Sequence, residues 1–325
     1  MRIWVLLGIL AVVAVLAPFT GPFIILLLAQ ILVLGIVAMS VDLLLGYTGL
    51  PSLGQAAYLG VGAYLTAILA TKFGFGLGWD FWLVVVMGMA AGAATAAFFG
   101  LFAIRASGVY FLMITLALGM CVWGLAYRWN SLTGGDNGIN MRGRPVMSGM
   151  RFADDLTFFY VVLGFFLAAF FTLQLLVNSP FGKSLVGIRE RELRMRILGY
   201  NTWLHKYIAF VTAGAFGGLA GVLWAHLNGI VSPSDLLLPA SVDVLLMVVL
   251  GGPGTLVGGL IGATVVVFLR EYLATIVPWW QYVLGTVYVL TILYLPSGIM
   301  GFFKGRKVRC VSCFSSFEEA HYSAG

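Results

Sequence analysis

The stretch FFYVVLGFFLAAFFTLQLLVNSPFGKSL, residues 158–185, joins a long apolar run to a short polar motif. A helix that crosses a bilayer needs about 20 consecutive apolar residues, and the run from Phe158 to Val177 has that length. Ser179 and Pro180 follow it and are typical of a helix end. The stretch therefore predicts a membrane-spanning helix followed by a turn.

The FGKS motif at residues 181–184 looks like the end of a phosphate-binding loop, G-x-x-x-x-G-K-[ST]. The first glycine of that loop should occupy position 177, where this chain has Val177. The loop should also follow a β-strand, and a helical run precedes it here. We therefore expect no nucleotide site in this chain, and the motif must serve another purpose.

The composition of the 325 residues extends the membrane interpretation to the whole chain. Hydrophobic residues make up 61%, charged residues only 9%, and there are 42 glycines. Continuous apolar runs indicate helices, because the strands of a membrane barrel would alternate apolar and polar residues. The fold class predicted is all-α and polytopic. The positive charges flank apolar runs, so the net charge of +6 does not indicate a nucleic-acid partner.

About ten transmembrane segments are predicted. They cover residues 3–17, 22–45, 55–71, 81–104, 108–128, 157–177, 206–227, 240–250, 255–272 and 279–297. The first of these could instead be a cleaved signal peptide. About two thirds of the lysines and arginines fall on the side that holds the N-terminus, which predicts cytoplasmic N- and C-termini. The largest inner loop is then 178–205 and the largest outer loop 129–156.

Two glycine- and proline-containing stretches interrupt the apolar pattern: GYTGLPSLGQ, Gly46–Gln55, and GGPGT, Gly251–Thr255. Breaks at membrane depth are tolerated where backbone is buried in protein or lines a cavity, and in transporters they often lie near the substrate path. A plain turn is the alternative for each. Ser40-Val41-Asp42 before the first break recurs as Ser241-Val242-Asp243 shortly before the second, which suggests an internal duplication.

Other glycines recur every three or four residues, which is typical of helices that pack closely in lipid. They are Gly60, Gly62, Gly88, Gly92, Gly214, Gly217, Gly218, Gly221, Gly258, Gly259 and Gly262.

Few residues suggest chemistry. Asp42 and Asp243 could be functional intramembrane carboxylates. A location near a membrane boundary, with a hydrogen bond to a helix end or to neighbouring hydroxyls, is favoured for both because neither has a nearby acidic or histidine partner in sequence. Cys310 and Cys313 form a C-x-x-C pair that lacks enough further ligands for zinc, so they are expected to be reduced. No catalytic triad, metal cluster or dinucleotide motif occurs, so no enzyme activity, metal or cofactor is predicted.

The inner segment is predicted to fold as a short helix from Lys183 to Leu198, with Gly199 as its stop. Its basic residues could serve only to orient the chain in the membrane. Glu190 and Glu192 argue against that alternative, because an orientation signal needs no acids. A surface that binds a partner protein is favoured.

Four stretches together resemble the inner-membrane permeases of ABC importers for branched-chain amino acids. They are GYTGLPSLGQAAYLGVGAYLTAIL from Gly46, IRASGVYFLMITLALG from Ile104, LTGGDNGI from Leu132 and SPFGKSLVGIRERELRMRILGYNTWLHKYIAFVTAGAFGGLAGVLWA from Ser179. The resemblance implies a permease domain over residues 1–305 and a bacterial inner-membrane location. Residues 306–325, which the family pattern does not cover, are then a cytoplasmic tail by the predicted topology.

The resemblance also implies partners and site residues. A separate ABC ATPase would dock on a coupling helix within 179–205, whose residues would include Gly182, Lys183, Arg189, Glu190, Glu192 and Gly199. A second permease subunit would share a translocation path flanked by Asp42, Ser52, Gln55, Gly251, Gly252 and Pro253. An external substrate-binding protein would dock at Gly135, Asp136 and Asn137.

The match to the coupling pattern E-A-A-x-x-x-G is partial. Gly199 fits the glycine position, but Leu193, Arg194 and Met195 occupy the glutamate and alanine positions, and Glu192 stands one place early. The function expected is ATP-driven import of branched-chain amino acids. The alternative is a self-sufficient secondary transporter or channel for a small polar solute, which would need ion-coupling residues in the membrane.

Overall fold

The computed structural model describes residues 3–74, 80–141, 146–147, 150–151, 155–276, 279–294 and 298–300. Within these ranges the long helices are α1 (Ile3–Leu16), α2 (Pro22–Asp42), α3 (Gln55–Ile68), α4 (Phe81–Ala103), α5 (Val109–Arg128), α7 (Asp155–Asn178), α10 (Thr202–Asn228), α11 (Leu238–Gly251), α12 (Leu256–Ile276) and α13 (Trp280–Tyr294). Each coincides with one of the ten predicted spans. The predicted tail, including Cys310 and Cys313, lies outside the described residues.

Seven helical segments of the described chain are long and apolar enough to cross a membrane: Pro22–Thr48, Gln55–Phe73, Phe81–Ala103, Val109–Arg128, Asp155–Asn178, Thr202–Asn228 and Leu256–Ile276. The prediction of an all-α, polytopic membrane protein is confirmed. Helix α11 has 14 residues. At 1.5 Å per residue its length is about 21 Å, short of the roughly 30 Å of a bilayer core.

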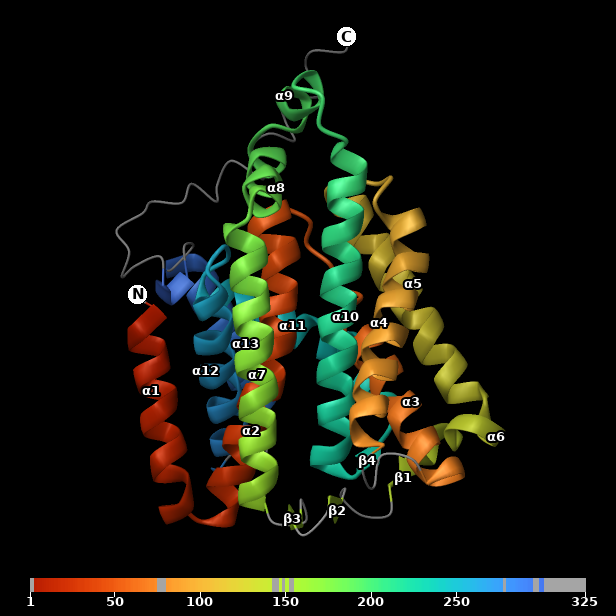
Figure 1. The fold of residues 1–325 in the computed structure, drawn as a ribbon, viewed down its shortest axis with the longest axis vertical. Helices are drawn as coiled ribbons and strands as arrows, with labels where there is room; N and C mark the ends of the chain where they lie inside the picture. Colours follow the sequence, from red (N-terminus) through yellow and green to blue (C-terminus); the bar gives the residue numbers. More distant parts are fainter. Residues whose placement is uncertain are drawn as a thin grey trace.

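The long helices form an elongated bundle with distinct structures at its two ends (Figure 1). Two short helices, α8 (Pro180–Glu190) and α9 (Glu192–Ile197), project beyond one end, toward which the start of α1 also lies. The opposite end carries α6 (Asn130–Thr133) and the strands β1 (Ile139–Asn140), β2 (Val146–Met147), β3 (Met150–Arg151) and β4 (Ile230–Val231). Strands β1 and β4 pair antiparallel, with Ile139 opposite Val231, as do β2 and β3.

Close glycine contacts join α4, α10 and α3. A Cβ added to Gly92 would lie 2.8 Å from the Gly218 Cα, and one added to Gly62 would lie 2.9 Å from the same atom. Backbones that approach this closely gain dispersion contacts, which drive helix association where lipid gives no hydrophobic force. The predicted role of these glycines in packing is confirmed.

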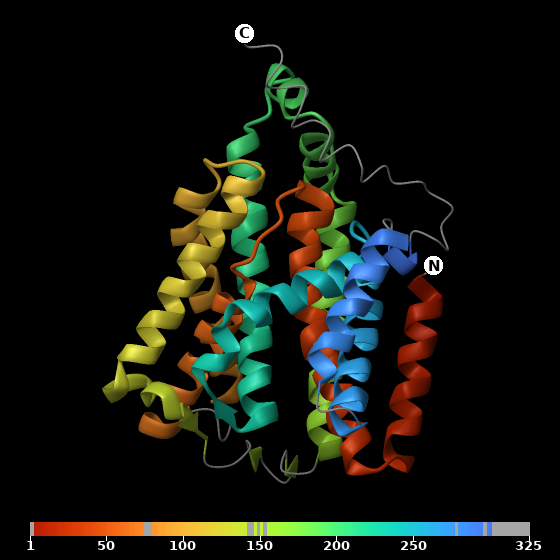
Figure 2. The same ribbon diagram turned by 180° about the vertical axis from the view of Figure 1, so that it is seen from behind.

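Both predicted breaks are real interruptions of helical structure. Helix α2 continues through a π-helical turn, Leu43–Thr48, and ends at Gly49, whose φ of 73° is left-handed. Residues 49–54 then lead into the bundle to the start of α3 (Figure 1). Helix α11 ends at Gly252 with φ 109°, and α12 starts four residues later. Figure 2 shows α11 running obliquely across the bundle, whereas its neighbours run lengthwise.

Candidate functional site

The segment between α7 and α10 folds as two helices and not as the single helix predicted from Lys183 to Leu198. Helix α8 begins at Pro180, where the Ser179 hydroxyl caps it by accepting a hydrogen bond from the Gly182 amide at 3.3 Å. Arg191 adopts extended backbone, with φ −153° and ψ 98°, and separates α8 from α9. Gly199 is left-handed with φ 87°, so the predicted stop is correct.

Gly182 has a steric reason to be glycine. It is buried, and a Cβ there would overlap the Val177 backbone. The FGKS motif therefore forms the tight start of a helix that follows directly on α7.

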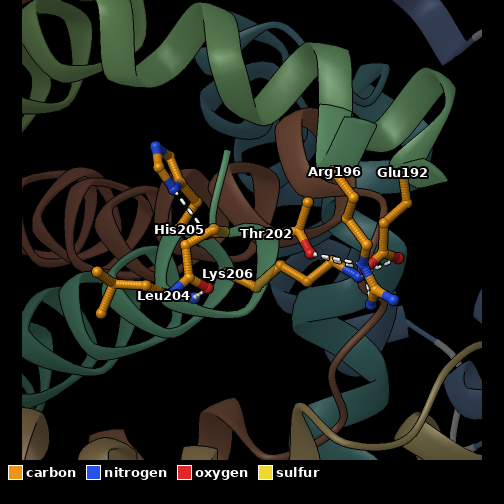
Figure 3. Close-up of polar contacts among 7 residues, drawn as sticks. Glu192, Arg196, Thr202, Leu204, His205 and Lys206 are labelled. Atoms are coloured by element: carbon orange, nitrogen blue, oxygen red, sulfur yellow. Dashed lines mark hydrogen bonds and ion pairs between the residues drawn. The ribbon is translucent and has the colours of Figure 1, made fainter. Parts of the chain in front are cut away.

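Glu192 connects α9 to the start of α10 (Figure 3). Its carboxylate accepts hydrogen bonds from Arg196 at 2.8 Å and Lys206 at 2.6 Å, and from the Thr202 hydroxyl at 3.1 Å. Burial raises the pKa of Glu192, but the hydrogen bond and charge of Lys206, with the bonds from Thr202 and Arg196, outweigh burial and leave the pKa below its ordinary value. Glu192 therefore links α9 to the start of α10 through two ion pairs and a hydrogen bond.

The two glutamates of the segment differ in placement. Glu190 and Lys183 are exposed, whereas Glu192 is half-buried and ion-paired. Exposed apolar side chains surround them, including Leu193 at 75% and Ile197 at 86%. An exposed apolar surface beside charged groups is typical of a protein interaction site.

Arg189 extends from α8 into the bundle and contacts both breaks. Its guanidinium donates a hydrogen bond to the Gly46 carbonyl in the π-helical turn after α2. A Cβ on Gly49 would lie 3.0 Å from the Arg189 Cγ, and one on Gly254 would lie 3.6 Å from its Nη1. One side chain of the projecting segment thus reaches two breaks that are far apart in sequence.

A hydrogen bond to Asp42 links the two breaks to each other. The Asp42 Oδ1 accepts this bond, of 2.6 Å, from the Gly254 amide, just before α12 begins, and the residue is fully buried. Gly46 allows the contact, because a Cβ there would overlap both the Asp42 carboxylate and the Gly254 backbone. Of the two kinds of partner predicted for Asp42, a helix end and neighbouring hydroxyls, the structure has the first, a backbone amide just before α12. We call Asp42, Gly46, Arg189 and Gly254 the junction.

The other residues predicted to flank the path divide into two groups. Residues 251–253 directly precede Gly254 of the junction, and there Gly251 packs on Gly258 of α12 and Gly252 on Gly298. Ser52 and Gln55 are buried at the start of α3 instead. The Ser52 hydroxyl accepts a hydrogen bond from the Gly54 amide at 3.3 Å, and the Gln55 side-chain amide has no hydrogen-bond partner in the described chain.

The predicted docking residues lie at the end of the bundle opposite α8 and α9 (Figure 1). Gly135, Asp136 and Asn137 form a 3-10 turn after α6. Gly135 is buried with φ 60°, while Asp136 and Asn137 are exposed. The two polar side chains are therefore accessible from that end.

Several of these partners have no counterpart among the residues predicted from sequence. Lys206 and Thr202 lie ten or more residues from Glu192, and Gly254 lies 212 residues from Asp42. Gly298 showed no periodicity that would link it to Gly252. The signal that the sequence offered was that Gly46 and Gly254 each belong to a glycine-containing break in the apolar pattern.

The fold and the junction define a class of protein: a multi-pass helical membrane permease, with broken helices connected to a segment that projects from the bundle. A family model described as the permease component of a branched-chain amino acid transport system matches residues 23–293. The chain belongs to this family of transport permeases.

Two relatives are named as high-affinity branched-chain amino acid transport system permease protein LivM, one from Salmonella typhimurium and one from Escherichia coli. Each is 29% identical over 288 residues, which cover 82% of this chain and 67% of the relative. A probable branched-chain amino acid transport permease protein LivM from Methanocaldococcus jannaschii is 24% identical over 309 residues, covering 82% of this chain and 89% of that protein. No solved structure matches the chain. The chain is thus a multi-pass inner-membrane transport component.

Proposed function

We propose that this chain is a permease subunit of an ATP-driven importer of branched-chain amino acids. An external binding protein delivers the substrate, and a separate ABC ATPase hydrolyses ATP. The observation that carries the proposal is the junction, because it connects the projecting segment to both helix breaks.

The α8–α9 segment provides the surface for the ATPase. Leu193, Ile197 and Leu198 are largely exposed, beyond the apolar bundle and beside charged residues. Burying them against a protein would remove their apolar area from water at about 25 cal/mol per Å². This assignment places α8, α9 and both termini on the cytoplasmic side, in agreement with the charge bias of the loops.

Arg189 then transmits movement of the ATPase. A displacement of α8 pulls on the Gly46 carbonyl, and Asp42 passes the displacement to Gly254 at the start of α12. Broken helices can respond by rotating about their glycines, since Gly49, Gly252 and Gly254 already adopt left-handed backbone. The chain acts as a passive gate whose state follows the ATPase.

The remaining partners follow from the two ends of the bundle and from the path. Asp136 and Asn137 give the binding protein polar contacts at the outer end. A second permease subunit completes the translocation path beside residues 251–253, Ser52 and Gln55. Residues 1–305 form the permease domain and 306–325 a cytoplasmic tail.

The test begins with the tagged chain, extracted in mild detergent and analysed for co-purifying proteins. Reconstitution of the complete assembly should give leucine uptake that requires ATP and the binding protein. Transport by the isolated chain without ATP would instead establish the secondary-transporter alternative. Co-purification without an ATPase, together with ATP-independent uptake, would contradict the assignment of α8–α9.

A further inference from the structure

A cavity of about 180 Å³ lies between α2, α3, α10, α11, α12 and the 3-10 turn Pro233–Leu236. A water molecule occupies about 30 Å³ in the liquid, so the cavity has roughly the size of six waters. That volume suits a small solute rather than a drug-sized ligand. The junction does not include this cavity.

The lining of the cavity has an apolar and a charged part. Leu34, Val37, Leu59 and Met247 contribute aliphatic and thioether surface. Asp235, Asp243 and Arg270 contribute two carboxylates and one guanidinium. A small solute here therefore meets both signs of charge and an apolar wall.

The charged groups are close but not paired with one another. Arg270 acts electrostatically on Asp235 and Asp243, yet its ion pair in the described chain is with Glu271, at 3.5 Å. Asp235 accepts a hydrogen bond at 3.3 Å from the Ser232 amide, and the Trp224 side chain, which also lines the cavity, interacts with its carboxylate. The Asp243 carboxylate forms no hydrogen bond or ion pair with the described residues. A half-buried charge without a partner is costly, and Asp243 is in that position, so this arrangement favours a ligand that brings a positive group to its carboxylate.

We propose that this cavity binds a zwitterionic α-amino acid with a short branched aliphatic side chain. Asp235 and Asp243 accept hydrogen bonds from the ammonium group, which has three donors. The Arg270 guanidinium binds the carboxylate through its planar fork. The side chain packs against the apolar wall.

This inference rests on the proposed function, since it gives the substrate a binding site within the permease. It adds that the permease itself selects the substrate after the binding protein releases it. A ligand with only an ammonium or only a carboxylate would leave charged groups of the site unpaired, and such losses discriminate strongly between analogues.

The test measures binding of radiolabelled leucine to the full chain in lipid nanodiscs. The competitors are leucine, 3-methylbutylamine and 4-methylpentanoate, which carry both charges, the ammonium alone and the carboxylate alone. We expect saturable binding that leucine displaces at concentrations at least tenfold lower than either analogue. Arg270→Gln and Asp243→Asn should each weaken leucine binding at least tenfold, and Arg270→Lys should weaken it less.

Arg128→Gln is the matched control, because Arg128 is exposed at the end of α5 and away from the cavity. Thermal unfolding of every variant separates loss of the site from loss of the fold. If a cavity variant does not fold, the analogue competition on the unaltered chain still decides the inference.

Three results would overturn the inference: no saturable leucine binding, equal competition by all three compounds, or unchanged affinity in folded Arg270→Gln and Asp243→Asn. Uptake by the complete assembly is measured in parallel. ATP-dependent leucine uptake without a site in the chain would sink this inference and leave the proposed function standing. An assembly that takes up no branched-chain amino acid would instead refute the proposed function.

Discussion

The α4–α10 interface and the α8–α9 segment satisfy opposite physical requirements. Between α4 and α10 the backbones touch, and a Cβ on Gly218 would overlap the Gly88 carbonyl and lie 3.1 Å from the Gly92 Cα. In α8–α9, ion pairs of Glu192 hold the shape while Leu193 and Ile197 stay exposed. The α4–α10 interface has no space for a larger side chain, whereas the α8–α9 segment leaves apolar side chains exposed to a partner. The comparison indicates a rigid body joined to a docking surface, with Arg189 as the connection.

The largest effect on stability is expected from Gly218→Ala, which adds a methyl group inside the α4–α10 interface. The added methyl must displace backbone atoms of α4, and overpacking of this kind costs about 1–3 kcal/mol. The melting temperature and the amount of folded protein in the membrane should both fall. Gly164→Ala on α7 is the control, since its Cβ would meet nothing within 4 Å. Equal losses in both variants would show that helix propensity or expression, and not packing, is responsible.

Arg189→Leu should remove the hydrogen bond between α8 and Gly46 while the bundle and the α8–α9 segment stay folded. A hydrogen bond from a charged group contributes about 1.5–3 kcal/mol, and ~1.4 kcal/mol corresponds to a factor of ten. ATP-dependent uptake by the complete assembly should fall roughly tenfold, with normal protein in the membrane. Arg105→Leu removes an exposed arginine between α4 and α5 and should have little effect. Normal uptake by Arg189→Leu would mean that the junction does not transmit movement.

Ile197→Ser tests the docking surface alone. Loss of about 1 kcal/mol of apolar burial should weaken binding of the ATPase about fivefold, measured by titrating the ATPase onto the purified permease. Ile230→Ser makes the same substitution at the opposite end of the bundle, where the isoleucine is 50% exposed, and should leave that affinity unchanged. Equal affinities for both variants would place the ATPase elsewhere.

The smallest effect concerns the ion pairs of Glu192. Because its pKa in the folded chain lies below the ordinary 4.5, its contribution is present above that value and is lost as the pH falls through the folded pKa. Amide hydrogen exchange in α9, corrected for intrinsic rates, should therefore rise by less than about twofold between pH 7 and pH 4. Glu192→Gln should abolish this pH dependence, while Glu190→Gln should keep it. A rise of the same size in Glu192→Gln would assign the pH dependence to another group.

Much of the fold could be predicted because its causes are local in sequence. Apolar runs placed every long helix, including those shorter than a bilayer core, and glycine and proline marked both breaks. The split of the inner helix at Arg191 could not be seen, since Glu190, Arg191 and Glu192 are all good helix formers. Contacts with α10, such as Lys206 to Glu192, override that preference.

The candidate site was predictable as a set of residues but not as an arrangement. Asp42, Arg189 and the GGPGT stretch were each singled out for separate reasons, and nothing in sequence placed them together. Their contacts join residues 143 and 212 positions apart, and long-range pairing leaves no periodic trace. Arg270 and Asp235 were not singled out, because each stands alone beside an apolar run.

The hydrogen bond between Asp42 and Gly254 also has a consequence for how the chain is made. The two residues are 212 positions apart, and synthesis proceeds at about 5–20 residues per second, so roughly 10–40 s pass between their appearances. During that time the ribosome has delivered the carboxylate but not its partner, and a carboxylate left alone in lipid is costly. The hydrogen bond between α2 and the start of α12 can therefore close only late in synthesis, after almost the whole bundle has been translated. Until then, burial of α2 in lipid favours the neutral form of the Asp42 carboxyl group.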